Sequence, residues 1–175
     1  MTRPIADIIR TEPIAAAALV VAAGGAATIL GAYYFQFVLG LPPCPLCLEQ
    51  RVPYYVGIPL AVVVAVLALR KGTPRGLLIG GLLLLAAAML VGAGLGVFHS
   101  GIEWKLWAGP TDCSGGAGLG SAGGLLDRLQ NINVVRCDEA AWRFLGLSLA
   151  GYNVLISLAL AFAASWGVAA GRKQV

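Results

Sequence analysis

The chain has 175 residues, of which 59% are hydrophobic and only 11% are charged, and its formal net charge is +4. A soluble globular domain carries roughly 25% charged residues. This composition therefore excludes an ordinary soluble enzyme, a disordered tail and a small disulfide-rich secreted domain. The basic residues are scattered singly or in pairs, without the stripe that nucleic-acid binding needs. We expect no nucleic-acid partner, and a lipid bilayer as the surroundings.

Four apolar stretches are long enough to cross a bilayer, which takes about 20 residues in a helix. They lie at 14–39, 52–69, 77–98 and 144–168. The first is longer than the roughly 7–15-residue core of a signal peptide, so we interpret it as a retained helix. The sequence predicts an all-α membrane protein, a four-helix transmembrane bundle, with 1–175 as a single domain.

The composition of these spans also predicts how they pack. They are rich in Gly and Ala, which allow helix backbones in a membrane to approach closely. Pro53 and Pro59 fall in the second span. Proline removes a helical hydrogen bond, so we expect the second span to be bent or locally unwound.

Charge placement predicts the orientation. Four spans put both termini and the 70–76 loop on one side of the membrane. That side has seven Lys or Arg residues and two acidic residues, whereas the other side has five Lys or Arg residues and six acidic residues. Loops rich in Lys and Arg stay in the cytoplasm. Both termini are therefore expected there, and the 40–51 and 99–143 segments face outward. All four cysteines lie in these outer segments, which in a bacterial envelope is an oxidising compartment.

Cys44 and Cys47 form a C-x-x-C pair before the second span. At the start of a helix this spacing gives a disulfide that opens easily and a thiolate with a depressed pKa. Pro45 suits the first turn of that helix. Arg51 follows Cys47 by four residues, which places both on one helical face. Its guanidinium has two interpretations: a partner for the thiolate and for a ligand's carbonyl oxygen, or a side chain that extends to the lipid headgroups.

Cys113 and Cys137 are the second pair, 24 residues apart in the outer loop. A disulfide between them would stabilise the fold by about 3.5 kcal/mol, because closing the loop lowers the entropy of the unfolded chain. In this interpretation the disulfide is a simple structural staple. The glycines within 115–124 favour the other interpretation, a mobile segment that carries a cysteine between partners. Residues 125–132 place leucines and an isoleucine on one face and predict a short helix on the membrane surface.

Four cysteines also permit a zinc site. Structural Cys₄ sites usually consist of two C-x-x-C units, and the second pair here lacks that spacing. We therefore expect no metal ion.

The segment 43–51, with the sequence PCPLCLEQR, resembles the DsbB family of bacterial inner-membrane proteins that generate disulfides, whose first periplasmic loop carries C-x-x-C-x-x-x-R. The resemblance extends over nearly the whole chain, to a second outer cysteine pair and to WRFLGL at 142–147 before the last helix. Together with the helix predicted at 125–132, the expected architecture is a four-helix bundle with a short periplasmic surface helix.

The resemblance also implies the reaction. The protein would be a thiol:quinone oxidoreductase that reoxidises a DsbA-like periplasmic thioredoxin-fold protein and passes electrons to ubiquinone or menaquinone in the membrane. The partner would attack Cys113, and Cys137 would then exchange with Cys44. The catalytic residues implied are the four cysteines: Cys44, Cys47, Cys113 and Cys137. The residues implied to bind the quinone are Arg51, Cys47 and His99 at the end of the third span.

Three other interpretations remain. A vitamin K epoxide reductase-like protein also links cysteines to quinones, but its C-x-x-C follows the loop pair, which is the reverse of the order here. A structural four-helix membrane protein with two stapled loops would have inert disulfides and no quinone. A scaffold that passes reducing equivalents outward would need a thiol pair on the cytoplasmic side, where the sequence has no cysteine.

Overall fold

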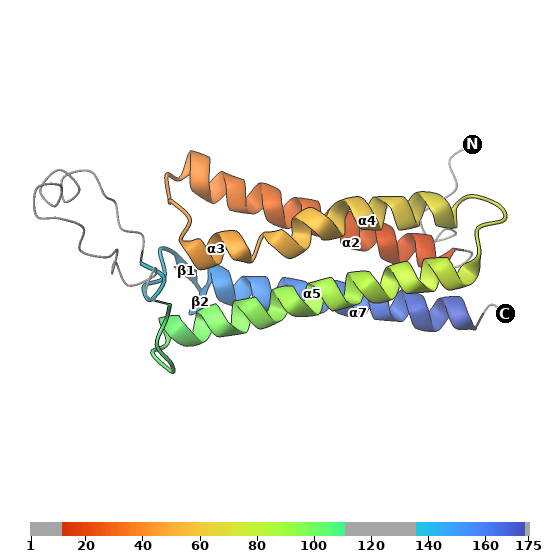
Figure 1. Ribbon diagram of the computed structural model, residues 1–175. Helices are drawn as coiled ribbons and strands as arrows, with labels where there is room; N and C mark the ends of the chain where they lie inside the picture. Colours follow the sequence, from red (N-terminus) through yellow and green to blue (C-terminus); the bar gives the residue numbers. More distant parts are fainter. Residues whose placement is uncertain (1–11, 111–135, 174–175) are drawn as a thin grey trace, which may run out of the picture.

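The computed structural model describes residues 12–110 and 136–173. Its elements in chain order are α2 (Pro13–Tyr33), the π-helix η1 (Tyr34–Val38), α3 (Pro45–Glu49), α4 (Val52–Ala68), α5 (Arg75–Glu103), β1 (Arg143–Phe144), β2 (Leu147–Ser148) and α7 (Leu149–Arg172) (Figure 1). Within this part of the chain four helical segments are long and apolar enough to cross a membrane. The predicted all-α four-helix fold is confirmed. The predicted surface helix at 125–132 lies outside the described residues.

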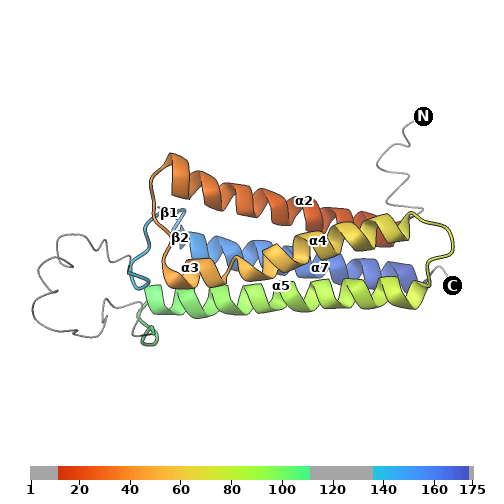
Figure 2. The same cartoon turned by 45° about the horizontal axis from the view of Figure 1, so that its top comes forward.

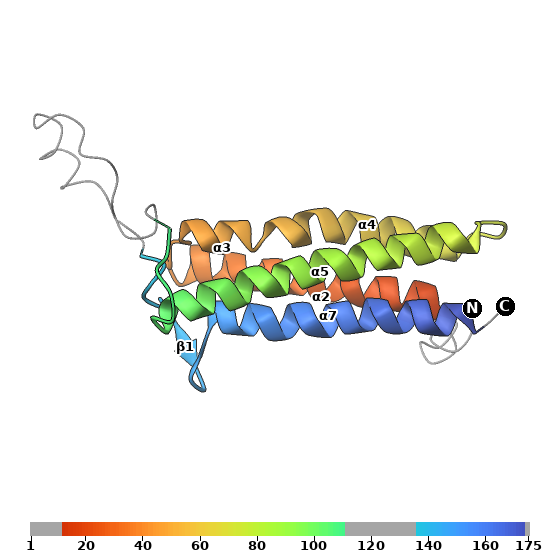
Figure 3. The ribbon, with the colours of Figure 1, turned by 60° about the horizontal axis from the view of Figure 1, so that its bottom comes forward.

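The four long helices pack around one core. α2 contacts α4 and α7, and α5 contacts the same two helices, so each helix has two main neighbours. Figure 2 shows α2 along one edge of the bundle, and Figure 3 shows α5 and α7 side by side along their length. Tyr54, Leu82, Leu85 and Met89 are fully buried between them. Large apolar side chains also cover the outside, as expected for helices surrounded by lipid tails.

The bundle has two chemically different ends. α3, the β1–β2 hairpin and the last turn of α5 lie together at one end, which we call the cysteine end (Figure 1). The first turn of α2, the α4–α5 loop and the last turn of α7 lie at the opposite end. The cysteine end is built from short elements, so it brings side chains from several parts of the sequence together.

Two predicted boundaries are wrong. The fourth helix begins at Leu149 rather than at 144, because β1 pairs antiparallel with β2. Leu145 and Gly146 between the strands have φ of 49° and 83°, the positive values that a tight two-residue hairpin turn requires. Ser148 then caps α7 by accepting a hydrogen bond from the Gly151 amide at 3.2 Å. The third helix is longer than predicted and continues to Glu103.

The expected unwinding within the second span is not found at either proline. α4 begins at Val52, so Pro53 lies in the first turn, where its missing N–H has no helical partner to lose. Pro59 lies inside α4, which continues as a helix to Ala68. The helical path is broken earlier, at Gln50 and Arg51 between α3 and α4.

Candidate active site

Cys44 and Cys47 lie in the first turn of α3, as the sequence predicted. Cys44 is the N-cap residue with extended backbone (φ −75°, ψ 165°), and its Sγ accepts a hydrogen bond from the Cys47 amide at 3.2 Å. Pro45 occupies the first turn and fixes the helical start. The two sulfurs are 2.7 Å apart and both thiols are free. A disulfide needs about 2.05 Å between sulfurs, so a small movement closes the pair.

The two thiols are not equivalent. Cys44 is buried, whereas Cys47 is partly exposed. The hydrogen bond with Cys47, together with burial, raises the pKa of the Cys44 thiol far above its ordinary value. The sequence-based expectation of a depressed pKa is therefore wrong for Cys44. The same contact lowers the pKa of the Cys47 thiol, so negative charge is favoured on Cys47 rather than on Cys44.

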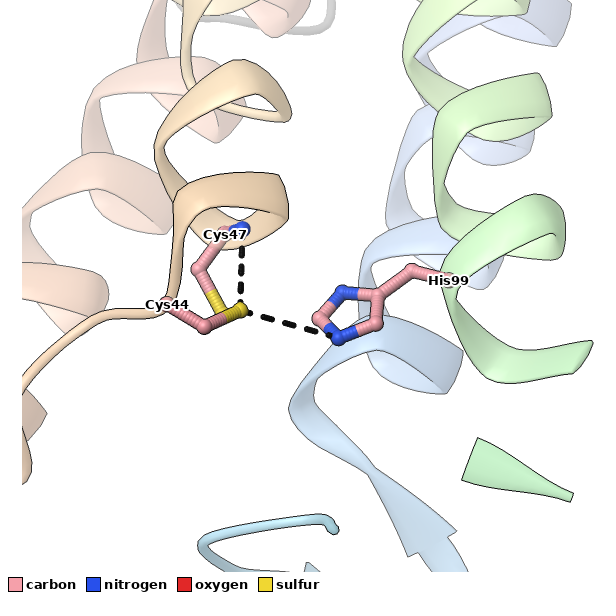
Figure 4. A group of neighbouring side chains, drawn as sticks. All are labelled: Cys44, Cys47 and His99. Atoms are coloured by element: carbon pink, nitrogen blue, oxygen red, sulfur yellow. Dashed lines mark hydrogen bonds between the residues drawn. The ribbon is translucent and has the colours of Figure 1, made fainter. Parts of the chain in front are cut away.

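His99 faces this pair from α5. Its Nε2 lies 3.7 Å from the Cys44 Sγ, and Figure 4 shows the imidazole directed at that sulfur. Its Nδ1 accepts a hydrogen bond from Gln50 Nε2 at 2.7 Å. The ring is 3% exposed, so protein groups rather than water supply its partners. The structure thus places His99 next to the C-x-x-C pair, although 55 residues separate it from Cys44.

Cys137 joins the same site. It is disulfide-bonded and buried, and it belongs to one cluster with Cys44, Leu46 and Ile102, against which Cys47 packs. The His99 ring also hydrogen-bonds the Cys137 backbone. One member of the second cysteine pair is therefore packed beside the first pair. Cys113, the other predicted site cysteine, lies outside the described residues.

Arg51 lies between α3 and α4, so it does not share one continuous helix with Cys47 as predicted. It is still near enough for electrostatic interaction with that thiol. Its Nη1 donates to Gln36 Oε1 at 2.8 Å, and its guanidinium carbon lies 5.4 Å from the centre of the Tyr33 ring. The residue is only 8% exposed. A side chain that extends to headgroups would be exposed, so the structure favours the interpretation in which Arg51 serves the site.

Several polar residues of the site were missed at the sequence level. Gln50 and Asn153 connect to His99 by hydrogen bonds, and Glu103 Oε1 lies 3.8 Å from His99 Nε2. Glu103 is buried and its Oε2 has no hydrogen-bond partner among the described residues. The available signal was the presence of a polar amide inside an apolar span, since such residues are costly in a membrane.

The geometry also bears on the alternatives for the cysteines. A Cys₄ zinc site would need Cys137 as a thiolate, whereas Cys137 is disulfide-bonded in this structure. Cys44, Cys47 and His99 do place three possible ligand atoms within 4.8 Å of one another. Two inert staples would hold the first pair closed, whereas both of its thiols are free in this structure.

Comparisons with known proteins point to one family. The family model described as "Disulfide bond formation protein DsbB" matches residues 15–167. The chain belongs to the DsbB family. "Disulfide bond formation protein B" of Marinobacter nauticus is 38% identical over 134 residues, which cover 71% of this chain and 73% of that protein. The protein of the same name from Saccharophagus degradans is 31% identical over 156 residues, covering 85% and 89%. No solved structure matches.

Membership of the DsbB family establishes the general chemistry. The chain is a multi-pass membrane protein of disulfide bond formation, and the activity is that of a disulfide-forming oxidoreductase. A vitamin K epoxide reductase-like assignment is thereby not supported. The structure brings the free C-x-x-C pair, Cys137 and the buried His99 together at the cysteine end.

Proposed function

We propose that this protein reoxidises a DsbA-like thioredoxin-fold thiol oxidase and passes the electrons to a membrane quinone. The observation that supports this most is the packing of Cys137 against Cys44 and Cys47 in one buried cluster. Thiol–disulfide exchange proceeds by attack of a thiolate on a disulfide sulfur, so the sulfurs of the two pairs must be able to meet. A shared cluster provides that proximity.

The proposed exchange conserves electrons and protons. A thiolate of the reduced partner attacks Cys113 of a Cys113–Cys137 disulfide, and the partner's second thiolate displaces Cys113, so the partner leaves with a disulfide. Cys137 then attacks Cys44 of a Cys44–Cys47 disulfide and releases Cys47 as a thiolate. Attack of Cys113 on Cys137 restores the loop disulfide. The partner has lost two electrons and two protons, and the Cys44–Cys47 pair has gained them.

A bound quinone would accept these electrons and protons from the Cys44–Cys47 pair. The donors at the site fit its two carbonyl oxygens. Arg51 has five N–H groups, and within the described residues it uses one of them for Gln36. His99 presents Nε2 beside the cysteines. Val52 and Tyr55, which follow Arg51, are exposed on the surface of the bundle, so a ring could reach Cys47 and Arg51 from the bilayer. Ubiquinone and menaquinone both carry the required carbonyl groups.

We further propose that 1–175 acts as a single domain in the bacterial inner membrane, with the cysteine end in the periplasm and both termini in the cytoplasm. The distribution of cations supports this orientation, because Lys and Arg gather on the cytoplasmic side. Among the described residues, the cations at the end of the bundle opposite the cysteines are Arg70, Lys71, Arg75, Arg172 and Lys173.

The test uses purified full-length protein in detergent with a reduced DsbA-like protein and a soluble quinone, and follows quinone absorbance in the ultraviolet. The wild type is expected to reduce quinone rapidly. Cys47→Ser removes the sulfur proposed to face the quinone and is expected to abolish the signal. Ser165→Ala is expected to keep it, because the Ser165 hydroxyl donates to the Ala161 carbonyl of its own helix, away from the cysteine end.

The opposite result is equally clear. If oxidised wild-type protein consumes neither ubiquinone nor menaquinone with several thioredoxin-fold partners, the proposal fails. Undiminished turnover in Cys47→Ser would remove Cys47 from the route of the electrons.

A further inference from the structure

A series of buried polar side chains leads from the cysteine site into the interior of the bundle. His99 Nδ1 accepts from Gln50 Nε2 at 2.7 Å, and Gln50 Oε1 accepts from Asn153 Nδ2 at 2.8 Å. Asn153 Oδ1 accepts from the Tyr54 hydroxyl at 2.8 Å. The Tyr54 and Ser157 hydroxyls are also 2.8 Å apart. The series connects α5, the α3–α4 junction, α4 and α7, and none of its members beyond His99 has a role in the proposed electron route.

The orientation of the Asn153 amide is fixed by its surroundings. Its Nδ2 donates to the Gly92 carbonyl at 3.3 Å as well as to Gln50, and its Oδ1 accepts from Tyr54. If the amide were reversed, its oxygen would face the Gly92 carbonyl oxygen and the Gln50 oxygen, and neither can donate. One orientation therefore satisfies every group, and leaving them unsatisfied in a buried site is costly.

The orientation of the Asn153 amide in turn fixes the orientation of the Gln50 amide. Its Oε1 faces the N–H of Asn153, and its Nε2 donates both to the Leu46 carbonyl at 3.3 Å and to His99 Nδ1. A reversed Gln50 would put its oxygen against the Leu46 carbonyl and its nitrogen against the Asn153 nitrogen. His99 Nδ1 therefore meets a donor and must act as an acceptor.

The consequence appears at the other nitrogen of the imidazole. With Nδ1 as an acceptor, the neutral ring carries its proton on Nε2. Nε2 lies 3.7 Å from the Cys44 sulfur and 3.8 Å from Glu103 Oε1. The hydrogen bond of the ring with the Cys137 backbone then also uses this proton, which lies beside the Cys44 sulfur. A proton at this position stabilises negative charge on Cys44 when it leaves a disulfide. The opposite tautomer would present a lone pair to the same sulfur and oppose that charge.

We propose that Asn153, held by Tyr54, is a positioning residue that acts through Gln50 to keep the proton of His99 on the nitrogen facing Cys44. This inference deepens the proposed function and rests on it for the role of Cys44. Hydrogen bonds between membrane helices add little stability on average, so stability alone is a weak reason for so many buried polar groups. Polar groups in membrane spans are by default functional.

The tautomer can be measured directly because the chain contains a single histidine. Full-length protein labelled with ¹⁵N in histidine is examined in detergent by NMR at neutral pH, with no partner and no quinone. The wild type is expected to show a pyridine-like Nδ1 and a pyrrole-like Nε2. In Asn153→Leu, Gln50 loses the donor that orients it, so the other tautomer is expected to become populated. Ser165→Ala, which removes a polar group from the same helix outside the series, leaves the spectrum unchanged.

Activity supplies the second measurement. With reduced partner and quinone, Asn153→Leu is expected to lower kcat roughly tenfold or more, as for a displaced catalytic group, with KM for the partner unchanged. The proposal is overturned if folded Asn153→Leu keeps the wild-type tautomer, or if the wild type carries its proton on Nδ1. If Asn153→Leu does not fold, Gln50→Glu decides: a carboxylate cannot donate to Nδ1, so Nδ1 is expected to become protonated, and an Nδ1 that stays pyridine-like contradicts the proposal.

The two measurements separate this inference from the proposed function. A wild-type protein with the expected tautomer that never reduces quinone would refute the proposed function and leave the positioning of His99 intact. A protein that turns over normally while Asn153→Leu and Gln50→Glu leave the tautomer unchanged would refute only the positioning role.

Discussion

Arg51 shows how a single residue can be placed for a ligand. Burying a charge is costly unless hydrogen bonds and opposite charges compensate. Among the described residues, the guanidinium of Arg51 contacts the amide oxygen of Gln36 and the face of the Tyr33 ring. The remaining N–H groups of the guanidinium are the ones available to a carbonyl oxygen. Arginine suits this role better than lysine, because its planar guanidinium presents several fixed N–H donors, whereas lysine offers a point charge on a flexible stem.

Arg51→Lys is therefore expected to raise the apparent KM for quinone roughly tenfold, the effect of about 1.4 kcal/mol of lost binding. The positive charge is retained, so exchange between partner and protein thiols in the absence of quinone should be unchanged. Quinone titrations of steady-state turnover measure the first effect, and stopped-flow exchange measures the second.

Arg143→Lys is the matched control for Arg51, because Arg143 is exposed in β1. It is expected to behave as the wild type in both assays. An unchanged quinone KM in Arg51→Lys would remove Arg51 from the binding site.

At the scale of the elements, charged hydrogen bonds connect the segment around Cys137 to the end of α5. Lys105, just beyond α5, donates to Asp138 Oδ2 at 2.7 Å, and Arg136 donates to both Asp138 oxygens at 3.0 and 2.9 Å. These hydrogen bonds, with that from Arg136 the stronger, hold the pKa of Asp138 well below its ordinary value. The contact is exposed, so its role is to place the chain beside Cys137 rather than to stabilise the fold.

The pH dependence of this contact follows from that depressed pKa. An unfolded aspartate titrates near about 3.9. Because the folded pKa is lower, the contact contributes fully above that value and is lost as the pH falls through the folded pKa. We expect tryptophan fluorescence to be constant from neutral pH down to about 4 and to change only in stronger acid, as Trp104 precedes Lys105.

Asp138→Asn supplies the control for this titration. It removes the charge, so the acid transition of the wild type should disappear, and amide hydrogen exchange in 104–110 and 136–139 should be faster at neutral pH. The melting temperature should stay the same. Unchanged exchange in both segments would show that the ion pairs do not hold them.

At the scale of the whole molecule, small residues set the distance between helices. A Cβ at Gly167 of α7 would collide with the Ala17 Cβ of α2 and with Leu82 of α5. A Cβ at Gly81 of α5 would lie 2.6 Å from a methyl of Val64 in α4. Lipid tails are as apolar as the helices, so close packing supplies much of the association energy in a membrane. The bundle is therefore sensitive to single methyl groups at these contacts.

Gly167→Ala is expected to lower the stability of the bundle by about 1–3 kcal/mol, the usual cost of overpacking. Gly94→Ala is the matched control, since a Cβ there meets nothing within 4 Å. Alanine favours a helix over glycine, so the control should be neutral or slightly more stable. Thermal unfolding of both variants in detergent measures the difference, and equal melting temperatures would contradict the packing argument.

Much of the architecture could be predicted from local sequence features. Apolar length predicted the four spans, and the C-x-x-C spacing with Pro45 predicted that Cys44 begins a helix. The predicted helix boundaries were wrong where an apolar run formed a different local structure. The apolar run at 144–148 forms a hairpin and a helix cap because the turn at Leu145 and Gly146 adopts positive φ. Pro53 caused no break because the chain had already turned at Gln50 and Arg51.

The sequence by itself determined the membrane fold, the pairing of a C-x-x-C with a following arginine and the identity of the family, because these depend on composition and short spacings. Only the tertiary structure decided which distant side chains meet. His99 reaches Cys44, Cys137 packs in the same cluster, and Asn153 faces Gln50 across the helices. The physical reason is that helix packing sets these contacts, and the rotation of each helix about its axis is fixed by side-chain fit rather than by any local pattern.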